Sequence, residues 1–163
     1  GFGVDEMART LARFGVTDYM VEIGGDLYTA GLNPDGRPWQ IGIETPQAFD
    51  RGVQEIVGVS NLGVATSGDY RNFFDADGQR YSHIIDATTG RPVTHQTASV
   101  TVLTENAMLA DAWATALLVL GRERGLEIAN DRDMAVLFIE RGPNAGDKGT
   151  VTTASERYKT LQA

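Results

Sequence analysis

The sequence predicts an α+β fold built mainly from an antiparallel sheet with a few packed helices. Residues 17–104 consist of short segments of strand-like pattern separated by turns rich in Gly, Asp, Asn and Pro. The apolar spacing becomes that of a helix at residues 105–121 and returns to that of a strand at "MAVLFIE". Because no regular crossover helices separate the strands, α+β is favoured over alternating βαβ units.

Individual elements follow from the same patterns. Apolar residues recur at helical spacing near the start of the chain, and Gly15 then supplies a helix stop. The positions of this first helix are Val4, Met7, Ala8, Leu11 and Phe14. Two more helices are predicted at residues 105–121 and 123–130, and the tail "SERYKTLQ" forms a last turn of helix.

Most of the remaining chain is predicted to be strand. The segment "TDYMVEIGGDLYTAG" gives two strands around Gly24-Gly25, and "WQIGIE" follows the turn "NPDGRP". We expect "VQEIVGVS" and "GVATSG" to form a strand pair. A hairpin is expected from "DYRNFF" and "QRYSHII" around the turn "DADG". Further strands are "TASVTVLT", "MAVLFIE" and "GTVTTA".

Length and composition limit the classes of function. The 163 residues are about one domain long, and we expect residues 1–163 to form a single domain. A net charge of −8 without a run of Lys or Arg disfavours nucleic-acid binding, which needs a basic face. The chain has no cysteine, which excludes thiolate metal sites and thiol catalysis within it. No apolar stretch reaches the roughly 18 residues of a membrane span.

Asp111 is a candidate metal ligand because it lies in the otherwise apolar helix "MLADAWATALLVL", where a buried carboxylate needs a partner or a cation. Thr115 follows four residues later on the same face. Ala107, Ala110 and Ala114 also lie there, and we expect these small side chains to leave room for a ligand. A carboxylate and a hydroxyl are hard oxygen ligands that suit Mg²⁺. The structural alternative is that Asp111 accepts hydrogen bonds from a loop and Thr115 bonds to its own helix.

The segment "YSHIIDATTGRPV" contains one of the two histidines, His83, with Asp86 three residues later. Imidazole titrates near neutral pH, so His83 is a candidate general base. Asp86 precedes a Thr-Thr-Gly turn and is equally a turn former whose side chain bonds the backbone. A histidine after a strand can also be structural, and the spacing alone leaves both interpretations open.

Two glycine-containing segments are candidate ligand sites. "ATSGDYR" predicts a turn around Ser67, whose amides and hydroxyls could hold an anion, or a tight β-connection that binds nothing. "EIGGD" predicts a close approach of a ligand to the backbone, or a bulge. It is not a dinucleotide-binding fingerprint, since the glycine order and the following helix are missing.

Taken together, four blocks resemble the ApbE family of FAD:protein FMN transferases in their order and approximate spacing. These blocks are "VEIGGDLYTAG", "ATSGDYRNFF", "SHIIDATTGRPV" and "LADAWATALLVLG". The most specific parts are H-x-x-D-x-x-T-G and A-D-A-x-x-T, and the resemblance extends over essentially the whole chain. "GFGVD" resembles the end of a further family block, (K/E)-G-(Y/F)-x-x-D. The chain therefore resembles the C-terminal half of a family member, and the resemblance implies an ApbE-like fold of the T-fold type.

The resemblance implies an enzyme that uses FAD and Mg²⁺, transfers FMN to a Thr or Ser hydroxyl of a target protein, and releases AMP. Asp111 and Thr115 match metal ligands, which would place Mg²⁺ on the pyrophosphate. His83 matches a histidine suited to accept the hydroxyl proton or to orient the phosphate. The residues expected to contact FAD or to shape its loop are Ser67, His83, Ile85, Asp86 and Gly90.

The resemblance also implies partners and a location. Targets in the family are flavin-bearing subunits of membrane redox pumps and related FMN-binding domains. Family members are usually exported and often lipid-anchored on the periplasmic side of the inner membrane, here through a part outside this chain. The sequence does not indicate an oligomeric state.

Three departures from the family pattern keep other functions open. Position 87 is Ala where many relatives have Pro, which loosens the turn. Position 114 is Ala where some relatives carry Asp as a further metal ligand, and this change is expected either to weaken metal binding or to leave more water on the ion. The family's N-terminal half, which supplies much of the FAD pocket, is not in this sequence. The alternatives are an FAD pyrophosphatase that yields FMN and AMP, or a flavin-binding domain without catalysis.

Overall fold

The structure, a computed structural model, describes residues 1–46, 52–70, 73–76, 79–142 and 149–163. It confirms the α+β class with a mainly antiparallel sheet. The main sheet has six strands in the order β1-β2-β5-β10-β11-β12, and every neighbouring pair is antiparallel. Its strands are β1 (Tyr19–Ile23), β2 (Asp26–Ala30), β5 (Gly63–Gly68), β10 (Thr97–Thr104), β11 (Ala135–Arg141) and β12 (Thr150–Ala154).

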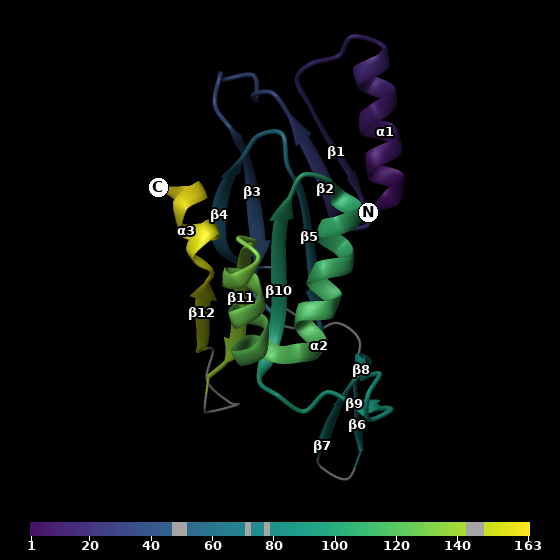
Figure 1. The fold of residues 1–163 in the computed structure, drawn as a ribbon, viewed down its shortest axis with the longest axis vertical. Helices are drawn as coiled ribbons and strands as arrows, with labels where there is room; N and C mark the ends of the chain where they lie inside the picture. Colours follow the sequence, from purple (N-terminus) through teal and green to yellow (C-terminus); the bar gives the residue numbers. More distant parts are fainter. Residues whose placement is uncertain (47–51, 71–72, 77–78, 143–148) are drawn as a thin grey trace.

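Three two-stranded sheets accompany the main sheet within the described residues. They pair β3 (Trp39–Glu44) with β4 (Val53–Val59), β6 (Phe73–Ala76) with β7 (Gln79–Ser82), and β8 (Ile85–Asp86) with β9 (Arg91–Pro92). Figure 1 shows the β6–β7 and β8–β9 hairpins together at one end of the molecule. The hairpin predicted around "DADG" is confirmed, although residues 77–78 of its turn lie outside the described residues.

The three described helices are α1 (Phe2–Arg13), α2 (Ala107–Asp131) and α3 (Glu156–Gln162). Within α2, Gly121 has φ 75° and ψ 171°, which interrupts the helical backbone. This break divides α2 into two helical stretches, which confirms the two predicted helices. Glycine occupies the break because any other residue is strained at such a φ. Gly15, at φ 77°, follows α1 as the predicted stop. Within the described ranges, no helix is long and apolar enough to cross a bilayer.

The main sheet is covered on both faces. Figure 1 shows α2 lying along β5 and β10, and these elements share the core cluster that contains Val100, Leu117 and Phe138. The opposite face packs against the β3–β4 hairpin and Tyr158 of α3. α1 covers β1 and β2 through a smaller cluster of Val4, Val21 and Ala107, which also brings α1 to the start of α2.

The predicted strand pair "VQEIVGVS"/"GVATSG" is wrong in its partners. Both strands form, but β4 pairs with β3, whereas β5 lies between β2 and β10 in the main sheet. The predicted turn around Ser67 is also wrong, since Ser67 lies inside β5 opposite Val100. Pairing between strands depends on residues far apart in the sequence, which local turn signals do not specify.

Candidate functional site

The first turns of α2 carry the two predicted metal ligands. Asn106 caps this helix, and its side chain accepts a hydrogen bond from Leu109 N at 2.8 Å. Asp111 is 49% exposed, so its carboxylate does not have the deep burial that the apolar sequence suggests. The site therefore lies at the edge of the buried face of α2 rather than within the core.

The predicted role of the neighbouring alanines is wrong. Ala107, Ala110 and Ala114 are fully buried and pack against the strands and helices of the core instead of opening a space for a ligand. Small side chains let the helix backbone approach the sheet closely. The helix thus uses its alanine face for packing, while Asp111 and Thr115 lie outside that packed face.

Ser67 and Thr115 are brought together by the packing of α2 on β5. Their hydroxyl oxygens are 2.8 Å apart, and either can donate the hydrogen bond. Ala65, two residues before Ser67, is buried against α2 in the same core cluster, and side chains two apart point to the same face of a strand. The structure therefore joins one predicted metal ligand to one predicted FAD-binding residue.

Asp111 also has a second carboxylate nearby, Asp26 at the start of β2. The amino group of Gly1 donates to Asp26 Oδ2 at 2.5 Å and to Asp111 Oδ2 at 3.0 Å. Burial raises the pKa of Asp26, and the negative charge of Asp111 adds to the increase, whereas the bond from Gly1 opposes it. Gly1 N thus lies between these two carboxylates.

His83, Ile85 and Asp86 lie on a separate segment that contacts α2 through β8. His83 is exposed between β7 and β8, and Ile85 is 49% exposed opposite Pro92. Between them, Ile84 packs against the core cluster shared by α2 and the sheet. The side chain of Ile84 thereby anchors the segment and leaves its two neighbours at the surface.

Asp86 shapes this segment as a turn former. Its Oδ1 accepts hydrogen bonds from the backbone N of Thr88 at 2.8 Å and from the Thr88 hydroxyl at 2.7 Å. These bonds, the hydroxyl first, lower the pKa of Asp86. The turn closes with Gly90 N donating to Asp86 O, and Gly90 has φ 66°. The structure therefore supports the turn-forming interpretation of Asp86, and its contact with FAD stays a prediction.

The oxygen atoms around α2 fit a hard cation in type but do not complete a site. Asp111 and Thr115 offer a carboxylate and a hydroxyl, and Asp26 lies beside the first of them. Among the described residues, no group of three or more His, Cys, Asp or Glu side chains is arranged to hold a metal. A cation here would need further oxygen ligands, and Mg²⁺ commonly takes these from water and substrate phosphates.

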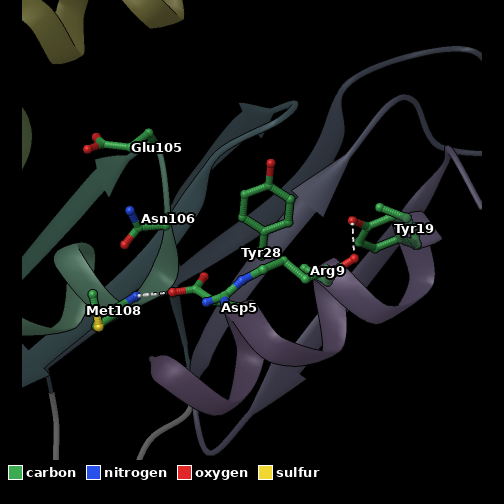
Figure 2. A pocket seen from close by; sticks show the side chains of 9 residues that line it. Asp5, Arg9, Tyr19, Tyr28, Glu105, Asn106 and Met108 are labelled. Carbon is green, nitrogen blue, oxygen red and sulfur yellow. Dashed lines mark hydrogen bonds between the residues drawn. The ribbon is translucent and has the colours of Figure 1, made fainter.

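The sequence interpretation gave no individual role to two residues of this region. Asp26 belongs to "EIGGD", but its partner Asp111 lies far along the chain, and no local spacing relates them. Asp5 of α1 bonds the first turn of α2 and borders a pocket of about 340 Å³ between α1, Tyr28 and the start of α2. Figure 2 shows its carboxylate pointing at the backbone of Met108. Asp5 is the final residue of "GFGVD", whose resemblance to a family block was noted, but that pattern assigned it no role.

Comparison with protein families and curated proteins gives consistent relatives. A model of the ApbE family matches residues 1–138. The FAD:protein FMN transferase of Vibrio cholerae serotype O1 is 49% identical over 159 residues, which is 98% of this chain and 46% of the relative. The protein of the same name from Haemophilus influenzae is 44% identical over 162 residues, or 99% of this chain and 46% of the relative.

Solved structures show the same similarity in three dimensions. The apo form of Pseudomonas stutzeri flavinyl transferase ApbE superposes with a TM-score of 0.84 at 42% identity, and covers 99% of this chain and 48% of its own. The flavin transferase ApbE from Vibrio cholerae gives 0.83 at 47% identity, with 98% and 49% covered. This chain spans about half the length of the relatives it matches.

Proposed function

The chain belongs to the ApbE family, and we propose on that premise that its protein is an FAD:protein FMN transferase. The protein would move the FMN part of FAD to a Thr or Ser hydroxyl of a target protein and release AMP. One contact in the structure supports this proposal independently of membership of the family. The packing of α2 on β5 joins Thr115 to Ser67, one turn from the paired carboxylates of Asp111 and Asp26.

Asp111 and Thr115 would hold the Mg²⁺ ion of this reaction. Both are oxygen ligands on one side of one helix, and both are accessible. When bound, Mg²⁺ would supply charge neutralisation for the pyrophosphate of FAD. The Ser67 hydroxyl, 2.8 Å from Thr115 Oγ1, lies where it can donate to a phosphate oxygen. These residues would hold the reacting phosphate in place, which is most of what a phosphoryl-transfer site has to do.

His83 would take the proton of the acceptor hydroxyl. In the proposed step, the hydroxyl oxygen of the target attacks the phosphorus on the FMN side and forms a new P–O bond. The bond from that phosphorus to the bridging oxygen breaks, and AMP leaves with the electron pair. The hydroxyl proton passes to the His83 imidazole, which is exposed and thus open to a macromolecular substrate. Exposed Ile85 would pack on FAD, with the Asp86 turn fixing the segment.

The sequence suggested that Ala114 removes a metal ligand and so favours a flavin-binding domain without catalysis. The structure gives this alternative less support. Its side chain is fully buried in the core cluster beneath α2. No oxygen ligand is therefore missing from the exposed side of the helix that carries Asp111 and Thr115. Metal binding would instead be completed by water, substrate and the remainder of the protein.

We further propose the acceptor and the location that the family suggests. The acceptor would be a flavin-bearing subunit of a membrane redox pump or an FMN-binding domain. The protein would act on the periplasmic side of the inner membrane, held there by a part outside this chain. Fractionation of cells that produce the full-length protein tests this location, and recovery in the cytoplasm would exclude it.

Incubation of the full-length protein with FAD, Mg²⁺ and candidate acceptor domains tests the function. We expect the intact mass of an acceptor to increase by one FMN phosphoester on a Thr or Ser, and the increase to disappear with EDTA or with Asp111→Ala. AMP release at the same rate without any acceptor would favour the pyrophosphatase instead. Tight FAD binding without AMP release in either condition would favour a binding domain.

A further inference from the structure

Asp5 joins the first turns of two helices that are far apart in the sequence. Its Oδ1 accepts from Ala107 N at 2.8 Å and its Oδ2 from Met108 N at 3.0 Å, across separations of 102 and 103 residues. Its side chain is buried, at 6% exposure, and Figure 2 shows it between α1 and the first turn of α2. Both oxygens of one carboxylate thus bond consecutive backbone amides of the helix that carries the proposed metal ligands.

Starting the helix does not by itself require Asp5. The N-cap of α2 is Asn106, whose side chain already accepts from Leu109 N at 2.8 Å. Asp5 satisfies the two preceding amides, which an N-cap leaves open. A negatively charged side chain at a helix N-terminus is also favourable. The feature that distinguishes Asp5 from Asn106 is that it fastens a second helix to this end.

The first turn of α1, which Asp5 bonds to α2, reaches the proposed metal site. Asp5 N donates to Gly1 O at 3.2 Å, one turn back along α1, and Gly1 N lies 3.0 Å from Asp111 Oδ2. Gly1 is packed tightly against the first turn of α2, because a Cβ on Gly1 would lie 2.4 Å from the carbonyl oxygen of Ala107. A shift of α1 against α2 would therefore move the backbone of Gly1 relative to the carboxylate of Asp111.

We propose that Asp5 is a positioning residue of the metal site, and this inference rests on the proposed function. Its carboxylate locks the first turn of α1 against the first turn of α2. The lock fixes Asp111 relative to Asp26 and to the backbone of Gly1. It also occupies the amides of Ala107 and Met108, so the N-terminus of α2 cannot serve as the phosphate site.

Asp5→Asn is the principal test in the full-length protein. The variant keeps the volume of the side chain but places an amide N–H against one of the two backbone N–H groups. Mn²⁺ serves as the probe, titrated by electron paramagnetic resonance in the presence of FAD. We expect the Mn²⁺ affinity to fall at least tenfold, and the Mg²⁺ concentration for half-maximal FMN transfer to rise by a similar factor.

Asn106→Ala is the matched control, because it removes a cap from the same helix end without releasing α1. We expect a comparable loss of thermal stability but an Mn²⁺ affinity within threefold of the unchanged protein. Equal Mn²⁺ affinities for Asp5→Asn and Asn106→Ala would overturn the positioning role. Asp5→Ser, which keeps a hydroxyl acceptor, should recover part of the affinity. If Asp5→Asn and Asp5→Ser both fail to fold, Asp5 is a folding residue and the inference is wrong.

Asp111→Asn separates this inference from the proposed function. Unchanged Mn²⁺ binding in Asp111→Asn would contradict the metal site itself. If Asp111→Asn abolishes binding while Asp5→Asn behaves like Asn106→Ala, the metal site stands and only the role of Asp5 fails.

Discussion

Replacement of Thr115 by Val tests the metal site with a known structural cost. The change keeps the shape of the side chain and removes the hydroxyl that bonds Ser67 at 2.8 Å. A neutral hydrogen bond contributes about 0.5–1.5 kcal/mol to stability, and this pair is exposed, so the lower end applies. For a domain of this size, each 1 kcal/mol shifts the melting temperature by about 2–4 °C. We therefore expect Thr115→Val to lower Tm by only about 1–2 °C.

The effect on metal binding is expected to be much larger. Loss of an outer-shell partner typically costs about 10–100-fold in metal affinity, and Thr115 is proposed as a direct ligand. The assay measures the Mg²⁺ concentration for half-maximal FMN transfer at saturating FAD, together with the Mn²⁺ affinity. We expect at least a tenfold weakening for Thr115→Val and recovery in Thr115→Ser.

Ser67→Ala is the control that breaks the same hydrogen bond from its other side. It should cost the same small stability as Thr115→Val, yet it removes only an outer-shell partner and leaves the Thr115 hydroxyl available, so the Mn²⁺ affinity should fall clearly less than in Thr115→Val. Indistinguishable metal affinities for Thr115→Val and Ser67→Ala would refute the assignment of Thr115 as a ligand.

Asp111→Ala should abolish Mg²⁺-dependent turnover without unfolding the protein, since the carboxylate is half exposed; an unchanged rate would exclude it as a ligand. His83→Ala should slow FMN transfer more than it weakens FAD binding, and a loss confined to FAD affinity, measured by fluorescence titration, would contradict its role as a base. Burial and the Glu55 carboxylate raise the pKa of Tyr158, so the folded state keeps this phenol protonated when the unfolded state loses its proton above about pH 10. Stability should then fall by up to about 1.4 kcal/mol per pH unit above that value, and denaturant unfolding of Tyr158→Phe should lack this component.

Local signals in the sequence predicted most of the elements. Gly24 and Gly25, both with positive φ, form the two-residue turn between β1 and β2. Gly121 interrupts α2 where the sequence suggested a second helix. The spacing of Asp111 and Thr115 predicted that they share one side of the helix, whereas the structure separates them from the packed alanine face on which the sequence interpretation had also placed them.

Relations between distant segments were not predictable from the same signals. One partner of β5 is β10, which follows the four strands of two hairpins along the chain, so the pattern near Ser67 suggested a turn instead of a central strand. The alanines of α2 were expected to leave space, but the sheet fills it. Asp5 is buried against amides about 100 residues away, and no periodicity connects two such positions.

The most direct test of the metal site is the position of an ion in the full-length protein. Crystals grown with FAD and Mn²⁺ give an anomalous signal that locates the metal without reference to activity. We predict a peak at coordination distance, near the roughly 2.0–2.1 Å of Mg²⁺ sites, from an oxygen of Asp111 and from Oγ1 of Thr115. A bound FAD whose metal lies elsewhere, with Asp111 and Thr115 bonded only to protein or water, would contradict it.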